Sequence, residues 1–120
     1  MKFDKNTVLT IIEEHFWNEL YNYIFDYVMN LDGDELFDLF ENSVDYAELD
    51  EVNQLEVDNI EVEEDNDTLN VIGRILAEVS LDGYTYWDGE NVCIGSVEHF
   101  IDFEFSFEVC DEKYSGFEMG

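Results

Sequence analysis

The feature that most constrains the fold of this chain lies in residues 100–110, where apolar and polar side chains alternate strictly from Ile101 to Val109. Successive side chains of a β-strand point to opposite faces, so the alternation places all the large apolar groups on one face and mostly acids on the other. The segment therefore predicts a strand with one face in a core and the other in water. The apolar residues of this strand are Ile101, Phe103, Phe105, Phe107 and Val109.

Alternation begins earlier, near Leu55, and indicates that the whole second half is rich in strands. We expect a strand over Leu55–Glu63, with a slip of phase at Asp58-Asn59 that suits a β-bulge, and a longer strand over Leu69–Leu81. Three turn or kink signals separate these runs. They stand at Asp65-Asn66-Asp67, Asp82-Gly83 and Asp88-Gly89.

The first part of the chain has helical periodicity. Apolar residues recur three or four apart over 6–31, which predicts one long amphipathic helix capped by Asn6 or Thr7. Trp17, Tyr21 and Phe25 widen its apolar stripe and suggest packing on two sides. A second, short helix is predicted over 35–41 with Asp34 as its cap. Its inward residues are expected to be Leu36, Phe37, Leu39 and Phe40.

Together these patterns predict an α+β fold, in which N-terminal helices pack on one face of an antiparallel sheet of three to five strands. A length of 120 residues suits a single domain. We expect a helical part over 1–42, an acidic connection over 43–54 that is a third short helix or a loop, a sheet part over 55–110 and a tail over 111–120.

The charge balance is extreme, with 32 Asp and Glu against 4 Lys and Arg and a formal net charge of −28. A hydrophobic fraction of 46% and an aromatic fraction of 16% nevertheless indicate a folded core rather than a disordered acidic tail. Between Lys5 and Arg74 the chain has twenty acids and no Lys or Arg, so helical Glu–Lys pairing is almost impossible there. These acids must face water, cations or a basic partner.

Enzymatic and cofactor chemistry are poorly supported, and we expect no enzyme, no catalytic residue and no cofactor. The Ca²⁺-loop pattern fails when either Gly33 or Gly89 is set at its central position. A zinc set would need paired ligand spacing, which the two His and two Cys lack. Neighbouring acids would also make a reactive thiolate scarcer. The residues that such a zinc set would use are His15, Cys93, His99 and Cys110.

The ordered acids are the candidate site, because their spacing could match that of phosphates. Side chains on one strand face repeat about every 6.6 Å, and B-DNA carries one phosphate charge per about 3.4 Å on each strand. Carboxylates from adjacent elements could approximate that density and compete for a Lys- and Arg-lined groove. The candidate partner-binding residues are Glu61, Glu63, Glu64, Asp65, Asp67, Asp102, Glu104 and Glu108.

In acidity, size and expected core, the whole chain resembles the acidic DNA-mimic inhibitors of phages and mobile elements, of the antirestriction and anti-CRISPR type, although it matches no family motif. The resemblance implies occupation of the basic groove of a nuclease, CRISPR effector or other nucleic-acid-binding protein. We expect a monomer or homodimer, and two cysteines are too few for a disulfide scaffold, so we expect it in the cytoplasm, that of a bacterial host if a phage or plasmid encodes it. Direct binding to nucleic acid or to an anionic membrane is disfavoured by repulsion. The alternatives are an acidic immunity protein or antitoxin that neutralises a basic toxin, and a halophilic protein of unrelated function.

Overall fold

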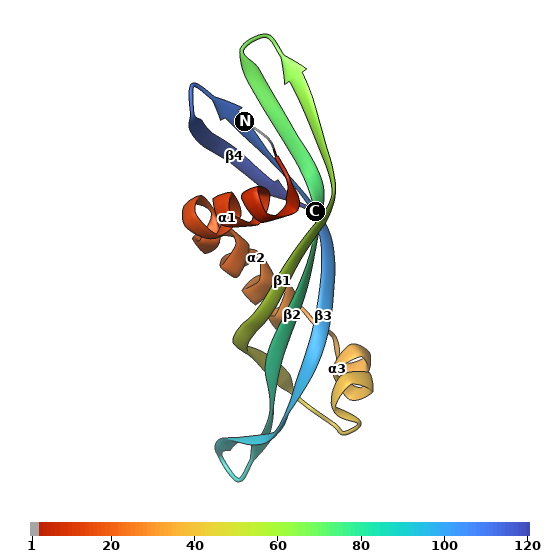
Figure 1. The fold of residues 1–120 in the computed structure, drawn as a ribbon. Coiled ribbons are helices and arrows are strands. Elements are labelled where there is room, and N and C mark those ends of the chain that lie inside the picture. The colour runs from red at the N-terminus through yellow and green to blue at the C-terminus, as the bar shows by residue number, and fades with distance from the viewer. Residues whose placement is uncertain (1–2) are drawn as a thin grey trace. The chain divides into compact units, whose positions relative to one another are not determined.

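The computed structural model describes residues 3–120 as three helices followed by a four-stranded antiparallel sheet, which confirms the predicted α+β fold. The helices are α1 (Lys5–His15), α2 (Trp17–Met29) and α3 (Gly33–Phe40). The strands are β1 (Tyr46–Asp65), β2 (Thr68–Trp87), β3 (Glu90–Cys110) and β4 (Lys113–Met119), and their order in the sheet is β1-β2-β3-β4 (Figure 1).

The predicted helix over 6–31 is two helices, broken at Phe16. This residue is the C-cap of α1, with φ −128° and ψ 16°, and its backbone N–H still donates to the Ile12 carbonyl. The break leaves the apolar face continuous, because Ile12, Phe16 and Leu20 are all buried. Asp4, rather than Asn6 or Thr7, caps α1 by accepting from the Thr7 N–H at 2.8 Å. The prediction of a single helix and of its cap is therefore wrong.

Helix α3 also begins earlier than predicted. Asp32 caps it by accepting from the Glu35 N–H at 2.8 Å, so Asp34 lies inside the first turn. Leu36 is buried, but Phe37 is 55% exposed, contrary to its predicted inward position. The reason is geometric: residues 36 and 37 are 100° apart on a helix, and a helix of eight residues covers the core along one narrow stripe.

The segment over 43–54 is neither a helix nor a loop, because β1 begins at Tyr46. Ala47 and Leu49 alternate with exposed acids and are buried, and this short alternation was hidden by the high density of acids. The predicted irregularity near Asp58-Asn59 is present, since Asn59 has a left-handed backbone with φ 53°. The predicted tail is also wrong, because residues 113–119 form β4.

Strands β2 and β3 are longer than predicted, and they meet at the turn formed by Asp88 and Gly89. Asp82-Gly83 is not a turn, because β2 continues through it. A Cβ at Gly83 would lie 2.7 Å from the Phe40 ring, so the glycine provides room for an aromatic side chain. The apolar face of β3 is buried as predicted at Ile101, Phe103, Phe105, Phe107 and Val109.

The described chain divides into two compact units. Unit 1 comprises the described part of 1–21 together with 55–77 and 102–120, and unit 2 comprises 22–54 and 78–101. In unit 1 the Phe16 ring stacks on Phe117 of β4 at 4.8 Å, and Phe107 lies 5.5 Å from it, so α1 ends against the β3–β4 hairpin. The division into two compact units does not decide whether the chain is one domain, so the single domain stays a prediction.

Within residues 3–120, no helix has the length and apolar character that crossing a bilayer requires; the longest, α2, has 13 residues.

Candidate protein-binding surface

The β3 part of the candidate site lies in unit 1, on the face of the strand opposite to the core. Asp102, Glu104 and Glu108 are all exposed, while Phe103, Phe105 and Phe107 between them are buried. The row is interrupted between Ser106 and Glu108, where the pairing of β3 with β4 shifts register. The outer face of β3 therefore presents the acids Asp102 and Glu104, then Ser106, and then Glu108 after the register shift. These side chains are not an evenly spaced row of acids.

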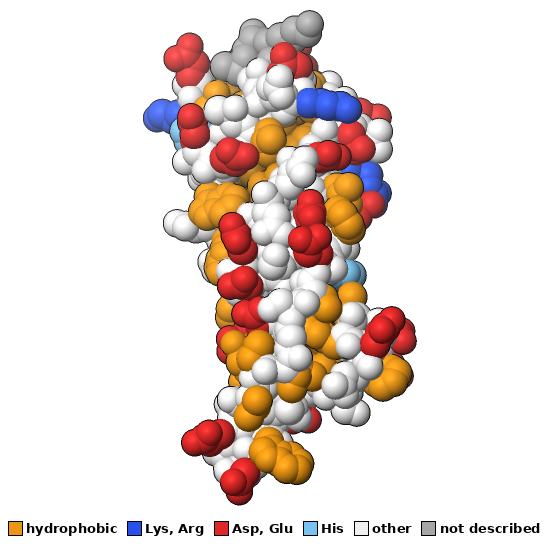
Figure 2. All heavy atoms as spheres, turned by 60° about the horizontal axis from the view of Figure 1, so that its bottom comes forward, with side chains coloured by type: hydrophobic (Ala, Val, Ile, Leu, Met, Phe, Trp, Pro, Cys, Tyr) orange, Lys and Arg blue, Asp and Glu red, His pale blue; other side chains and the backbone are white. Residues whose placement is uncertain are grey.

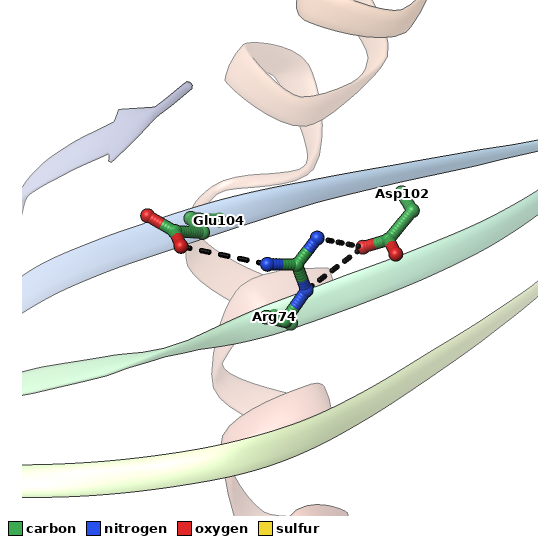
Figure 3. Close-up of polar contacts among 3 residues, drawn as sticks. All are labelled: Arg74, Asp102 and Glu104. Carbon is green, nitrogen blue, oxygen red and sulfur yellow. Dashed lines mark hydrogen bonds and ion pairs between the residues drawn. The ribbon is translucent and has the colours of Figure 1, made fainter.

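Arg74 of β2 neutralises part of this row (Figure 3). Its Nη2 lies 2.9 Å from Asp102 Oδ1, its Nε donates to the same oxygen at 3.1 Å, and its Nη1 lies 3.4 Å from Glu104 Oε1. A single guanidinium thus bridges two of the three acids predicted to face a partner. Two of the eight candidate acids therefore already have a cationic partner, and that partner is the only arginine of the chain.

The sequence contained a signal for this bridge. Arg74 stands at an even position in the β2 run whose odd positions, including Val71 and Ile75, are apolar. The alternation alone places it on the outer face with the β3 acids. What the sequence did not provide was the register that brings Arg74 opposite residues 102–104.

The second part of the candidate site is at the end of the β1–β2 hairpin, also in unit 1. Its acids are all exposed, and none forms an ion pair with a Lys or Arg among residues 3–120. The turn that joins the strands contains Asn66 with φ 57°, a left-handed conformation that Asn adopts readily. These acids are Glu61, Glu63, Glu64, Asp65 and Asp67.

The structure separates the two groups of acids, because β2 lies between β1 and β3. Neighbouring strands are about 4.8 Å apart, so β1, which carries Glu61, Glu63, Glu64 and Asp65, lies two strand spacings, about 10 Å, from β3. Asp67 lies in the β1–β2 turn, next to the start of β2. The eight candidate acids therefore do not form one row. Figure 2 likewise shows acidic side chains dispersed among hydrophobic and uncharged ones on the face that it draws.

The possible zinc residues are not gathered into a site. Among residues 3–120, no group of three or more His, Cys, Asp or Glu is placed to hold a metal ion. His15 packs against the Tyr114 ring at 4.7 Å, and His99 stacks on Tyr27 with ring centroids 6.5 Å apart. Both cysteines are free and exposed, so they do not act as small core residues.

Unit 2 has a pocket that the sequence analysis missed. Its volume is about 480 Å³, and α2, the connection after it and α3 all contribute to its wall. Spacing on α2 could have suggested half of it, since Tyr23 and Tyr27, like Asp26 and Asn30, are four residues apart and so share a helix face. The approach of Glu35 depends on the angle between two helices, which no local pattern encodes. The residues that line the pocket are Tyr23, Asp26, Tyr27, Asn30, Leu31 and Glu35.

Two ionisable side chains of unit 2 have perturbed pKa values. Burial raises the pKa of the Tyr84 phenol, and the nearby Glu48 carboxylate adds to this effect. Burial lowers the pKa of His99, and Glu35 opposes that shift by favouring the imidazolium. Both shifts follow from packing, with the Tyr84 ring stacked on Tyr46 at 5.2 Å and His99 against Tyr27.

No protein-family model matches this chain, and neither a curated protein nor a solved structure matches it.

Proposed function

We propose that this protein binds a basic nucleic-acid-binding protein, a nuclease or CRISPR effector, and blocks the groove that would otherwise hold DNA or RNA. The observation that carries the proposal is the exposed acidic end of the β1–β2 hairpin, whose five carboxylates have no Lys or Arg partner among residues 3–120. Uncompensated charge of this kind destabilises the compact state, so a use in binding would account for it.

The hairpin provides the order that such a surface needs. Its acids are attached to a sheet whose central strand is anchored in a core, with Val71 and Ile75 of β2 buried. Fixed charges lose little freedom on binding, which favours affinity.

Arg74 favours the hairpin, rather than β3, as the primary contact. Asp102 and Glu104 already have a cationic partner, so they offer less uncompensated charge to a new one. Reversing these two acids to Lys would also place new positive charge against Arg74, so a change in binding would not report on the lost acids alone. Neutral variants of β3 acids are therefore the better probe of that edge.

The test begins with capture of a binding protein from host lysate, elution with salt and identification of the eluted protein. We expect to capture a nucleic-acid-binding protein whose affinity for this chain falls as salt rises. The DNA that this protein binds should compete with the chain for the same surface. Simultaneous binding of DNA and this protein, or affinity unchanged in molar salt, would exclude groove occupation.

A matched pair of variants then locates the contact. Glu61→Lys/Glu63→Lys/Glu64→Lys should weaken the complex at least tenfold, because three carboxylates of the hairpin become cations. The control, Glu13→Lys/Glu14→Lys/Glu19→Lys, makes the same change of net charge at exposed helical positions of unit 1. A larger loss in the helical variant would place the docking surface on α1 and α2 instead.

A further inference from the structure

The pocket of unit 2 has the composition of a site for an organic cation. Two phenol rings, Tyr23 and Tyr27, and two carboxylates, Asp26 and Glu35, line a volume of about 480 Å³. Aromatic faces attract cations through their quadrupole, and a guanidinium both stacks on such a ring and pairs with a carboxylate. A Ca²⁺ ion would instead seek six to eight oxygen ligands, more than these two carboxylates provide.

Local structure holds the carboxylate side of the pocket in place. The last turn of α2 closes with Asn30, whose backbone N–H and side-chain amide both donate to the Asp26 carbonyl, at 3.1 and 2.8 Å. Across the connection, the Glu35 N–H donates to the Asp32 cap, which fixes the first turn of α3. Asp26 and Glu35 therefore project from two defined helix ends.

The aromatic side is supported from the sheet. Tyr27 packs against the His99 ring of β3, with the ring planes 20° apart, which limits the directions the phenol can take. Tyr23 lies one turn earlier on the same face of α2 and is half-buried. A flat cation entering the pocket would meet a Tyr27 ring that is already oriented, so little freedom of that side chain is lost on binding.

The electrostatics of unit 2 also favour a cation, and the unit contains no Lys or Arg. It contains fifteen Asp and Glu, ten in 22–54 and five in 78–101, and all four Lys and Arg of the chain lie outside it. The C-terminal end of α2, where the helix dipole is negative, has no basic residue in its last turn. Burial lowers the pKa of His99 and so disfavours its charged form, and any other positive group must come from outside the unit.

From these observations we infer that the pocket of unit 2 binds an arginine side chain. The inference rests on the proposed function for its source, a surface arginine of the basic partner, which would insert between the tyrosines while its guanidinium pairs with Asp26 and Glu35. This gives the partner a specific contact in unit 2, in addition to the diffuse attraction of the hairpin acids in unit 1.

The test uses N-acetyl-arginine amide as the probe and the full chain as the receptor, and binding is measured by NMR chemical shifts. N-acetyl-citrulline amide has the same shape without the charge and serves as the ligand control. We expect saturable shifts for Tyr23, Tyr27 and Asn30 with the arginine probe and none with citrulline. Equal shifts from both probes, or no saturable shift in the pocket, would overturn the inference.

Two variants separate the pocket from general acidity. Asp26→Asn/Glu35→Gln should weaken arginine binding at least tenfold, whereas Asp50→Asn/Glu90→Gln, which removes the same charge from exposed positions of unit 2, should change it less than twofold. Tyr27→Leu keeps every charge and should still weaken binding severalfold. Equal losses in the two charge variants would show diffuse attraction, and an unaffected Tyr27→Leu would exclude the aromatic contact.

This experiment is independent of the captured partner. If the captured protein binds DNA and this chain at the same time while the arginine probe still fills the pocket, the groove proposal fails and the pocket stands. If capture depends on the hairpin but the probe does not bind, the groove proposal stands and the pocket assignment fails.

Discussion

Arg74 Nη2 lies 2.9 Å from Asp102 Oδ1, so the only arginine of a chain with net charge −28 is bound to the strand expected to present its acids. The ion pair joins the outer faces of β2 and β3 within unit 1, and Glu104 completes it from the next outward position of β3 (Figure 3). The side chains of Arg74, Asp102 and Glu104 are 40%, 54% and 71% exposed, and pairs as exposed as these contribute little to stability.

Replacement of Arg74 by Gln should therefore expose charge at small cost in stability. We expect the free energy of unfolding to fall by less than about 1 kcal/mol. Arg74→Gln should also elute from an anion exchanger at higher salt than Lys113→Gln, because only the former releases two carboxylates locally. Lys113 is an exposed residue at the start of β4, so both variants have the same net charge. Identical elution would mean that the bridge does not mask the β3 acids in solution.

Gly73 of β2 accommodates the Phe105 ring, and a methyl group there should destabilise unit 1. A Cβ at this position would lie 2.8 Å from Phe105 Cε1 and 3.1 Å from the Asp58 carbonyl oxygen. Overpacking of this kind costs about 1–3 kcal/mol. Gly73→Ala should lower the urea midpoint by a corresponding amount, and Phe105→Leu in the same chain should recover part of the loss.

Gly33→Ala is the control for that experiment, because a Cβ at Gly33 would have no atom within 4 Å. Its urea midpoint should not fall. If Gly73→Ala and Gly33→Ala behave alike, the close approach of Phe105 to β2 is not a feature of the protein in solution.

The helices and strands of this fold were predictable where a single pattern of apolar residues dominated the local sequence. The odd positions of β3 from Ile101 to Val109 are apolar without exception, and every one of them is buried. The helix break at Phe16 was not predictable from the sequence pattern. Phe16 fits the apolar face of residues 6–31 equally well in one continuous helix and in two helices that end and begin beside it. Tyr46–Gln54 was missed because acids occupy both faces of a strand that has few buried neighbours there.

The sequence predicted that the candidate site is acidic and exposed, but it did not predict which acids are neutralised by a basic side chain. Exposure of Glu61–Asp67 followed from acids at a turn. Neutralisation of Asp102 by Arg74, and the meeting of Tyr27 with Glu35 in one pocket, depend on strand register and on a helix-to-helix angle. Both contacts are set by packing between separate strands or helices, and a local pattern of apolar and polar residues does not predict such contacts.

Asp45 should hold the end of β2 near the exposed Tyr86 and Trp87. Its Oδ2 accepts from the Tyr86 N–H at 2.7 Å and from the Thr85 hydroxyl at 3.2 Å, and its own N–H donates to the Tyr84 carbonyl. Hydrogen bonds to a charged acceptor contribute about 1.5–3 kcal/mol. Asp45→Ala should accelerate hydrogen exchange at the Tyr86 amide by tenfold or more, whereas Asp50→Ala should not. Unchanged exchange at Tyr86 would show that Asp45 does not restrain the strand.

His99 should make unit 2 less stable in mild acid. Burial against Tyr27 lowers the pKa of this histidine in the folded state below the ordinary value of 6.5, so the unfolded chain binds the proton more readily. The contribution of His99 to stability is therefore complete above about pH 6.5 and falls as the pH drops towards the lower folded pKa. His99→Gln should reduce the loss of melting temperature between pH 7.5 and pH 5.5. A loss as large as that of the parent chain would assign the pH dependence to other groups.

Stability should rise with salt at moderate concentrations and then level off. Thirty-two acids against four basic residues repel one another, and screening shortens the reach of that repulsion from about 10 Å at 0.1 M to about 3 Å at 1 M. We expect the melting temperature to increase with KCl mainly below a few tenths molar, from a chain that is already folded in dilute buffer. Sucrose, which favours compact states without screening charge, is the control and should not reproduce that early rise. A chain that is unfolded in dilute buffer and folds only near molar KCl would instead be a halophilic protein, and its acids would then need no basic partner to explain them.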